Sequence, residues 1–374
     1  MRRGAAIFAP VLTILVLACA PQGTDAQAPS ALSDSAFAAL VSRTSEAGGF
    51  FDTDNLISNE DSYLHPVSTL RAIGTSGGVY VGVGPDQNFS YIAAVRPHAA
   101  FIVDVRRDNV LEHLLFKATF ALSRNRVEYL ALLFGRAAPA DTAGWAAKPV
   151  DSLLYYIDAA RPDSAIALSI RAHVLAEVRR SAIPLSGTDL ATISRFHDAF
   201  IASGPALRFN TFGRAPQPYY PDYRRLARET DRDGRQAGFL ATEEAFQFVK
   251  SLEDRNLLIP LVGDFAGDRA LASVAAWMTE HDETLSTLYT SNVEQYLFRD
   301  GGFDAFARSV AAFPHDSRSA IVRSCFTCFA GHPQAVDGYH AVMVVQLVDR
   351  FLELHAAGQL RRYYDLVTNG LVTP

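Results

Sequence analysis

The sequence lacks several signatures by which catalytic sites are commonly found. It contains no Gly-x-Ser-x-Gly elbow between a strand and a helix, no His-Glu-x-x-His pair and no phosphate loop that ends in Gly-Lys-Ser/Thr. The sequence therefore offers no evidence for a hydrolase of the elbow type, a zinc protease or a P-loop enzyme. It also contains no internal repeat and no long low-complexity segment.

The chain has no excess of basic charge. Its 34 Lys and Arg residues are outnumbered by 40 Asp and Glu residues, so the formal net charge is −6. Binding to nucleic acid begins with the neutralisation of phosphates by clustered basic side chains. We therefore expect a small-molecule ligand and no nucleic-acid partner.

Long hydrophobic runs are also missing. One apolar run, Ala5–Ala18, follows two arginines and precedes Cys19. It is shorter than the roughly 20 residues of a membrane-spanning helix, and its flanks are typical of a secretory signal. The sequence Val-Leu-Ala-Cys that ends at Cys19 resembles a bacterial lipobox. We expect residues 1–19 to be a lipoprotein signal, and the exported chain to contact the membrane only through a lipid on Cys19.

A plain signal with an incidental cysteine, cleaved after Ala26 or Ala28, is the alternative. Residues 20–31 are small, polar and contain proline, which is typical of a flexible tether. The rest of the chain has an ordinary globular composition, since the whole sequence is 49% hydrophobic and 20% charged. We expect residues 32–374 to form a single domain.

Short apolar runs predict an α/β fold. Val79–Val83 and Ala100–Val105 have the length of strands, and residues 88–95 between them carry a short helical pattern. Residues 109–122 place leucines on one helical face, and Val127–Phe134 predicts a third strand. Strands that are almost continuously apolar and alternate with helices indicate a mostly parallel, Rossmann-like sheet that is flanked by helices.

Residues 137–245 interrupt this alternation. They predict helices near 147–160, 165–179 and 188–202, which we interpret as a helical insertion or cap over the sheet. The alternation then resumes. Further strands are predicted at Leu257–Val262, Leu285–Thr290 and Ala320–Cys325, and further helices near Asp268–Thr279 and Tyr339–Leu354.

The turn after the first predicted strand indicates a ligand site. Gly82 and Gly84 allow a tight turn and a close approach of a ligand to the backbone. Asp104 ends the second strand at the same sheet edge, where a carboxylate can accept hydrogen bonds from ribose hydroxyls. Asp86 occupies the third glycine position of a dinucleotide motif, and its charge disfavours a pyrophosphate. A ligand with a ribose and a cationic arm, such as S-adenosylmethionine, meets no such repulsion.

At these residues the chain resembles the class I S-adenosylmethionine-dependent methyltransferases, over roughly 77–134 and 257–326. "GVGPDQ" stands in place of their first motif, Asp104 in place of their ribose-binding acid, and Asp264 in "VGDFAGD" near their fourth motif. The segments "GGFFDTDNLISNEDSYL", "YIAAVRPHAAFIVDVRRDN" and "SNVEQYLF" look like those of uncharacterised bacterial proteins with such a core. Tyr80 and Asp86 depart from the methyltransferase pattern.

The resemblance implies a methyltransferase-like fold and leaves two functions open. In the first, the glycine turn and Asp104 bind S-adenosylmethionine for methyl transfer to an unknown substrate, and no metal is required. In the second, an exported, non-catalytic protein uses the same scaffold to bind another ligand or partner, because fold does not imply function. Export favours the second, since the methyl donor is made and used in the cytosol.

Three polar clusters fall near the predicted strand ends. One contains Asp52, Asp54, Asn55, Asn59 and Glu60; we interpret it as a capping segment or a lid in preference to a Ca²⁺ site. The second contains Asp264, Asp268 and Arg269, for ligand binding or helix capping by Asp268. The third contains Ser291, Asn292, Glu294, Gln295 and Tyr296, for pocket lining or helix capping.

Two further groups carry polar chemistry. Cys325 and Cys328 are expected to form a disulfide or to be inert thiols, with redox catalysis and zinc binding together with His332 and His340 as alternatives. The segment 219–234 mixes tyrosines with charges. It is either a surface loop with ion pairs or a cap that supplies Tyr220, Tyr223 or Arg224 to a ligand.

Overall fold

The structure is a computed structural model of the chain, and it describes residues 1, 29–213, 215, 217–326, 328 and 330–374. The expected signal 1–19, with Cys19, and most of the expected linker lie outside this part, apart from Met1. Within the described part, no helix is long and apolar enough to cross a membrane.

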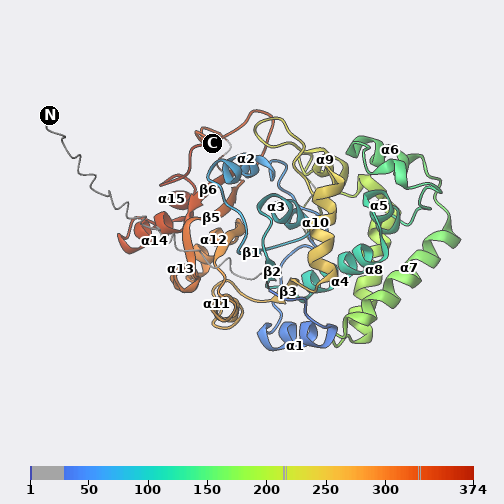
Figure 1. Cartoon of the computed structure of the whole chain (residues 1–374), viewed down its shortest axis with the longest axis horizontal. Helices are drawn as coiled ribbons and strands as arrows, with labels where there is room; N and C mark the ends of the chain where they lie inside the picture. Colours follow the sequence, from blue (N-terminus) through green and yellow to red (C-terminus); the bar gives the residue numbers. More distant parts are fainter. Residues whose placement is uncertain (2–28, 214, 216, 327, 329) are drawn as a thin grey trace.

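A six-stranded, mostly parallel sheet lies at the centre of the fold (Figure 1). Its strand order is β3-β2-β1-β4-β5-β6, and only β6 runs antiparallel to its neighbour. The strands are β1 (Val79–Gly82), β2 (Ala99–Asp104), β3 (Leu258–Val262), β4 (Leu285–Ser291), β5 (His315–Cys325) and β6 (Val342–Leu347). This order is that of a Rossmann-like sheet. The expectation of a mostly parallel α/β sheet is confirmed.

Helices cover both faces of the sheet (Figure 1). Because of this cover, every residue of β1, β2 and β3 is buried, as expected for parallel strands. One face carries α2 (His65–Ala72), α3 (Gln87–Val95), α4 (Arg107–Leu122) and α10 (Glu243–Asp254). The other carries α1 (Asp34–Thr44), α11 (Ala270–Glu280), α12 (Val293–Asp300), α13 (Phe303–Ala312), α14 (Val348–Ala356) and α15 (Tyr363–Leu366).

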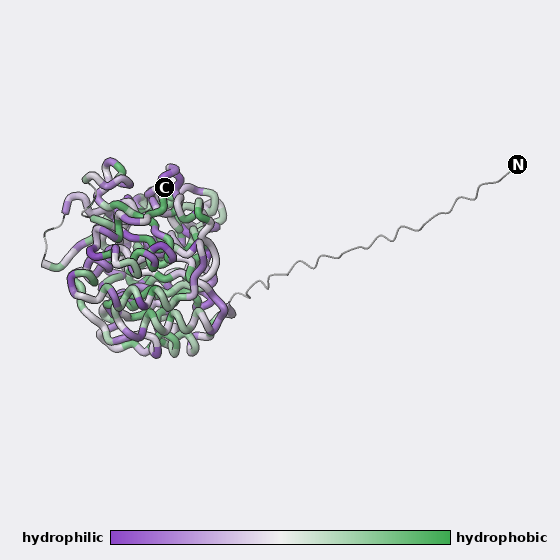
Figure 2. Tube along the Cα trace, turned by 90° about the vertical axis from the view of Figure 1, so that its left-hand side faces the viewer, coloured by the Kyte–Doolittle hydropathy of each residue, from purple (hydrophilic) through white to green (hydrophobic). Residues whose placement is uncertain are grey.

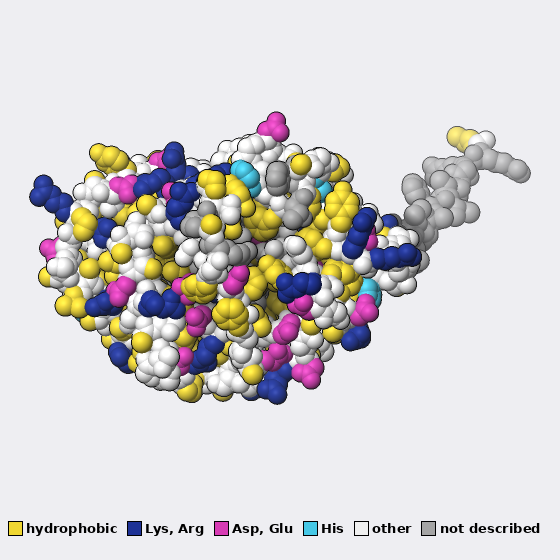
Figure 3. Space-filling model, turned by 180° about the vertical axis from the view of Figure 1, so that it is seen from behind, with side chains coloured by type: hydrophobic (Ala, Val, Ile, Leu, Met, Phe, Trp, Pro, Cys, Tyr) yellow, Lys and Arg dark blue, Asp and Glu magenta, His cyan; other side chains and the backbone are white. Residues whose placement is uncertain are grey.

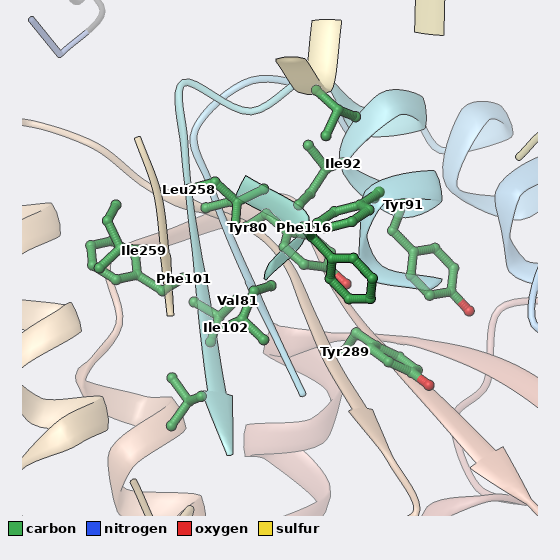
Figure 4. Close-up of a cluster of buried hydrophobic side chains, with 14 of the residues drawn as sticks. Tyr80, Val81, Tyr91, Ile92, Phe101, Ile102, Phe116, Leu258, Ile259 and Tyr289 are labelled. Atoms are coloured by element: carbon green, nitrogen blue, oxygen red, sulfur yellow. The ribbon is translucent and has the colours of Figure 1, made fainter. Parts of the chain in front are cut away.

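The core forms where strand and helix side chains meet. Figure 4 shows this cluster, with Tyr80, Val81, Phe101 and Ile102 from the central strands close to Tyr91 and Phe116 from the covering helices. Hydrophobic stretches run through the middle of the body, and hydrophilic ones lie mainly at its periphery (Figure 2). Among the described residues visible in Figure 3, basic and acidic side chains are interspersed over the face.

The predicted strand Val127–Phe134 is wrong. This segment forms α5 (Arg126–Leu133), whose N-cap Asn125 accepts a hydrogen bond from the backbone N–H of Glu128. Nearly all of α5 is buried, so it shows no polar face that would have revealed a helix. The third parallel strand in the chain is therefore β3, which comes after the insertion.

The predicted helix over Tyr339–Leu354 is also partly wrong. Its first half contains β6, which pairs antiparallel with β5 from Val342↔Cys325 to Leu347↔Ala320. The helix α14 begins only at Val348. Val342, Val344 and Val345 are β-branched, which favours a strand. Pairing with β5 satisfies the backbone groups of this run on one side.

The inserted helices form a layer beside the sheet instead of a cap over it. They are α6 (Val150–Ala159), α7 (Ser164–Val178) and α8 (Gly187–Ser203). Two of them, α7 and α8, pack on α4, while α6 packs on α5 and on the short helix α9 (Tyr223–Arg228) (Figure 1). Two parts of the insertion reach the carboxyl edge of the sheet. In α8, Asp189 pairs with Arg107 after β2 (2.9 Å) and Arg195 pairs with Asp54 (2.6 Å). The segment after α8, which includes α9, also reaches this edge.

Candidate functional site

A strap, residues 52–64, crosses the carboxyl edge of the sheet. After β2, the Arg106 guanidinium donates to the carbonyls of Thr53 (3.1 Å) and Asp54 (2.7 Å). Before β6, the Ser62 hydroxyl donates to the carbonyl of Ala341 (2.6 Å). The expected capping segment therefore ties the ends of β2 and β6 together. In the described part of the chain, no group of three or more His, Cys, Asp or Glu side chains is placed to hold a metal.

Glu60 of the strap is buried near the point where the chain leaves the adjacent strands β1 and β4 for helices on opposite faces of the sheet. Open α/β sheets bind ligands at this switch point. The Glu60 carboxylate accepts hydrogen bonds from the hydroxyls of Tyr289 (2.5 Å) and Ser291. Burial raises its pKa, against these hydrogen bonds. Ser291 has a positive φ of 52°, a backbone conformation uncommon outside glycine, at the end of β4. The strap thus fills the switch point with one of its own carboxyl groups.

The glycine turn after β1 is packed against the chain itself. A Cβ atom on Gly82 would lie 2.0 Å from Asn88 Oδ1 and 2.7 Å from the Tyr80 hydroxyl oxygen. Tyr80 donates a hydrogen bond to that same Asn88 oxygen (2.8 Å), and Asn88 Nδ2 donates to the carbonyl of Gly84 (3.1 Å). Gly84 has a φ of 85°, which favours glycine. Both glycines are therefore required by local packing and turn geometry.

Asp104 is paired with Arg106. One carboxylate oxygen accepts from the Arg106 backbone N–H (2.9 Å) and from Nε (3.1 Å), and the other accepts from Nη2 (2.9 Å). Both side chains are buried, each 6% exposed. Each oxygen that could receive a ribose hydroxyl is thus already bonded to the neighbouring arginine.

Asp86 behaves differently, although it also ends a strand-to-helix turn. It occupies the N-cap position of α3, but its carboxylate makes no capping hydrogen bond. The residue is 7% exposed, and among the described residues no Lys, Arg or His forms an ion pair with it. Burial raises the pKa of Asp86 to about 7, against the effect of the Tyr223 hydroxyl. A carboxylate without a cation is costly to bury.

A small pocket opens beside Asp86. Its free volume is about 20 Å³, roughly enough for one water molecule or a group of that size. It lies between the turn after β1, the end of the strap, α9 and the segment before α10. Its lining residues are Tyr63, Asp86, Gln87, Tyr223, Leu226, Ala227, Gly238, Phe239 and Leu240.

The family of the chain follows from its sequence. A family described as a domain of unknown function, DUF7790, matches residues 56–152 and 205–367. The chain belongs to the DUF7790 family. No curated protein matches it. The matched residues include all six strands, the strap from Leu56 onward and the whole lining of the pocket. They leave out residues 153–204, which form most of the helical layer.

Asp264 lies at the same edge of the DUF7790 domain but outside the pocket. It is exposed, and one of its oxygens accepts from the backbone N–H of Ala266 (2.8 Å). The expected cap of α11 by Asp268 is wrong, because the Glu46 carboxylate accepts from the backbone N–H groups of Arg269 (3.1 Å) and Ala270 (2.7 Å) instead. The sequence did not reveal Glu46, since it is more than 200 residues away along the chain.

Asn292 also lies outside the pocket. It is the half-buried N-cap residue of α12, and it makes no capping hydrogen bond. The neighbouring Glu294 is fully buried and pairs with Arg323 (2.7 Å) on β5. Of the third polar cluster, Glu294 therefore belongs to a buried ion pair. Of the residues predicted at the strand ends, Asp86 lines the pocket, whereas Gly82, Gly84, Asp104, Asp264 and Asn292 do not.

Several residues of the pocket were missed. Gln87 ends "GVGPDQ" and Tyr63 lies in "GGFFDTDNLISNEDSYL", but neither was predicted to bind a ligand, and Phe239 lies in the insertion without a motif. Tyr223, expected as a possible cap residue, does line the pocket, whereas Arg224 pairs with Asp158 (3.0 Å). The stretch Gly74–Gly78 fits the letters Gly-x-Ser-x-Gly, but it precedes β1 and thus lies at the opposite end of the strand from a nucleophile elbow.

Cys325 and Cys328 form a disulfide, with their Cα atoms 5.7 Å apart. Residues three apart on a regular strand point to opposite faces. Here β5 ends at Cys325, so the chain leaves the strand and brings the second cysteine back. The expectation of a disulfide or inert thiols is confirmed for this pair.

Proposed function

We propose that this DUF7790 protein is an exported, lipid-anchored protein that binds a small ligand in the pocket beside Asp86. The observation that carries the proposal is the Asp86 carboxylate, which is buried without a basic partner among the described residues and lines a pocket. Strained or unsatisfied polar groups inside a cleft are typical of ligand sites, because a ligand supplies the missing interaction.

The contrast with the glycine turn supports this choice of site. Three hydrogen bonds from Arg106 engage the Asp104 carboxylate, and the side chains of Asn88 and Tyr80 cover Gly82. A nucleoside on this turn would have to displace all of these contacts. The pocket beside Asp86 requires no such displacement for a group of the size of water.

Binding of S-adenosylmethionine for methyl transfer is the second candidate. The strand order, with the Gly84 turn after β1 at the switch point, favours it. It requires the strap to open and Asp104 to exchange Arg106 for ribose hydroxyls. Export argues against it, because the methyl donor is a cytosolic compound.

Thermal unfolding of the protein with a panel of small polar metabolites tests the first proposal. Gly238 lines the pocket with an ordinary φ, and a Cβ on it would meet no atom closer than 3.6 Å. Gly238→Leu should therefore fill the pocket and remove any stabilisation by a ligand. Gly187→Leu is the matched control, since a Cβ there meets nothing within 4 Å. Stabilisation that persists in Gly238→Leu would place the ligand elsewhere.

Calorimetric titration with S-adenosylmethionine, S-adenosylhomocysteine and NAD separates the two candidates. We expect no heat from any of the three with the folded protein. Tight binding of either adenosyl compound would establish the second candidate. Tight binding of NAD would also show that Asp86 does not repel a pyrophosphate.

Cell fractionation tests the localisation. The unaltered chain should sediment with membranes of the exported compartment, and Cys19→Ser should be released from them. Equal release of both would refute lipidation and support a plain cleaved signal.

A further inference from the structure

We infer that the ligand presents a primary ammonium group to Asp86, an inference that rests on the proposed function and specifies its ligand. The charge of the site favours a cation. Asp86 is 7% exposed and has no basic partner among the described residues. A cationic group that enters the pocket supplies the missing counter-charge where water screens it little.

Hydrogen-bond acceptors outnumber free donors around the pocket. Within the described part of the chain, Gln87 Oε1 is buried without a hydrogen-bond partner, whereas Gln87 Nε2 donates to the Tyr289 hydroxyl (3.2 Å). The Tyr63 hydroxyl donates to the carbonyl of Leu226 (3.1 Å), so its proton is engaged. The Tyr223 hydroxyl lies close enough to Asp86 to lower the pKa of its carboxyl group, but it has no hydrogen-bond partner within 3.5 Å among the described residues, so its oxygen can accept.

The lining therefore offers mainly acceptors, namely the Asp86 carboxylate, Gln87 Oε1 and the Tyr223 oxygen. An occupant that donates several hydrogen bonds matches this set. A primary ammonium carries three N–H donors and no acceptor, and it also carries the required charge. A carboxylate, a phosphate or a halide would add acceptors and negative charge.

The size of the pocket and its aromatic walls also favour a small cation. Tyr63, Tyr223 and Phe239 line the pocket, and the faces of aromatic rings attract cations. The free volume of about 20 Å³ admits a head group of the size of –NH₃⁺. A trimethylammonium group is several times larger, so the pocket should select primary over quaternary amines.

The test uses n-butylammonium, butan-1-ol and butyltrimethylammonium as probes, each titrated into the full chain and followed by calorimetry or NMR. We expect n-butylammonium to bind and the other two to bind at least about tenfold more weakly, because they lack the charge or the fit. Asp86→Asn should weaken n-butylammonium by about tenfold or more. Asp264→Asn, an exposed acid at the same edge, should leave its affinity unchanged.

The pH dependence provides a second readout. The titratable groups around Asp86 are Tyr63 of the strap, Glu112 of α4, Tyr129 of α5 and Tyr223 of α9. The tyrosines stay neutral, since burial raises their pKa further, and burial likewise raises the pKa of Glu112. Between pH 6 and pH 8 the affinity for n-butylammonium should therefore rise as Asp86 ionises, and it should stay constant in Asp86→Asn.

Four outcomes would overturn the inference. If butan-1-ol binds as tightly as n-butylammonium and Gly238→Leu abolishes this binding, the pocket binds a ligand but is not an ammonium site. Affinity for n-butylammonium that Asp86→Asn does not change would place the amine elsewhere. If n-butylammonium fails to bind while a metabolite of the panel binds in a manner sensitive to Gly238→Leu, the proposed function stands without the ammonium. If neither binds, both are overturned.

Discussion

The turns after β1 and β2 differ in whether their buried aspartate is paired with a basic side chain of the described residues. Both turns lie at the carboxyl edge of the sheet, and each carries an aspartate that is hardly exposed, Asp86 at 7% and Asp104 at 5%. Asp104 has Arg106 two residues later, and the pair also holds the strap through Thr53 and Asp54. Asp86 is followed by Gln87 and Asn88, which carry no charge. The comparison indicates that Asp104 is neutralised within the fold, whereas Asp86, without a basic partner among the described residues, is the acid at which we propose a ligand binds.

The largest loss of stability is expected when the ion pair between Asp104 and Arg106 is broken. Asp104→Ala leaves the Arg106 guanidinium buried without its partner, which typically costs about 3–5 kcal/mol. We expect a loss of this size in the free energy of unfolding, measured by urea denaturation. The exposed Asp264→Ala should change it by less than about 0.5 kcal/mol. A loss below about 1 kcal/mol for Asp104→Ala would show that the ion pair does not stabilise the fold.

Removing the charge of Asp86 should have the opposite effect on stability from removing that of Asp104: it should increase the free energy of unfolding at neutral and higher pH. Because the pKa of Asp86 is about 7 in the folded chain and near 4 when unfolded, its protonated form favours folding. This stabilisation is complete below about pH 4 and is lost as the pH rises through 7, with a total of roughly 4 kcal/mol for three pKa units at 1.36 kcal/mol each.

Asp86→Asn sharpens this expectation. The variant should be more stable than the natural chain at pH 8, and the difference should shrink towards pH 4. The measurement is urea denaturation of both proteins at several pH values. Taking the difference removes the contributions of Glu60 and Glu112, whose pKa values burial also raises. A difference that is independent of pH would mean that Asp86 ionises freely in the folded chain.

Gly82 and Gly238, which both lie at the carboxyl edge of the sheet, differ in how tightly their surroundings are packed. Gly82→Ala brings a Cβ within 2.0 Å of Asn88 Oδ1 and should cost about 1–3 kcal/mol through overpacking. Gly238→Ala places its Cβ at ordinary contact distances of 3.6 Å or more and should change the free energy of unfolding by about 0.5 kcal/mol or less. Thermal or urea denaturation measures both. Equal tolerance of the two substitutions would show that the turn after β1 is not tightly packed.

The smallest effect is expected at the disulfide, which lies apart from both turns. Cys325→Ser/Cys328→Ser opens a very short loop and should cost about 2 kcal/mol or less. Ligand binding beside Asp86 should not change, since neither cysteine lines the pocket. Binding that is lost while the circular dichroism spectrum stays native would contradict this expectation.

Local pattern was sufficient for most of the sheet. Five of the six strands follow from short apolar runs, because strands that are buried on both faces are apolar throughout. The same rule produced the error at Val127–Phe134, since a helix buried on nearly all sides is equally apolar. The edge strand β6 was missed because its pairing with β5 and its junction with α14 depend on contacts outside the segment.

The sequence by itself determined that Gly82, Gly84, Asp86 and Asp104 lie at one sheet edge, because strand periodicity and chain direction fix which end of a parallel strand each turn occupies. It could not determine which acid is neutralised. Only the tertiary structure decided that Arg106 folds back onto Asp104, that Asn88 and Tyr80 fill the space over Gly82, and that Tyr63 and Tyr223 enclose Asp86. Tyr223 is more than 100 residues from Asp86 along the chain, and local sequence does not record which distant segment buries an acid. Arg106 is only two residues from Asp104, but its guanidinium also bonds to the distant carbonyls of Thr53 and Asp54, which local sequence does not record either.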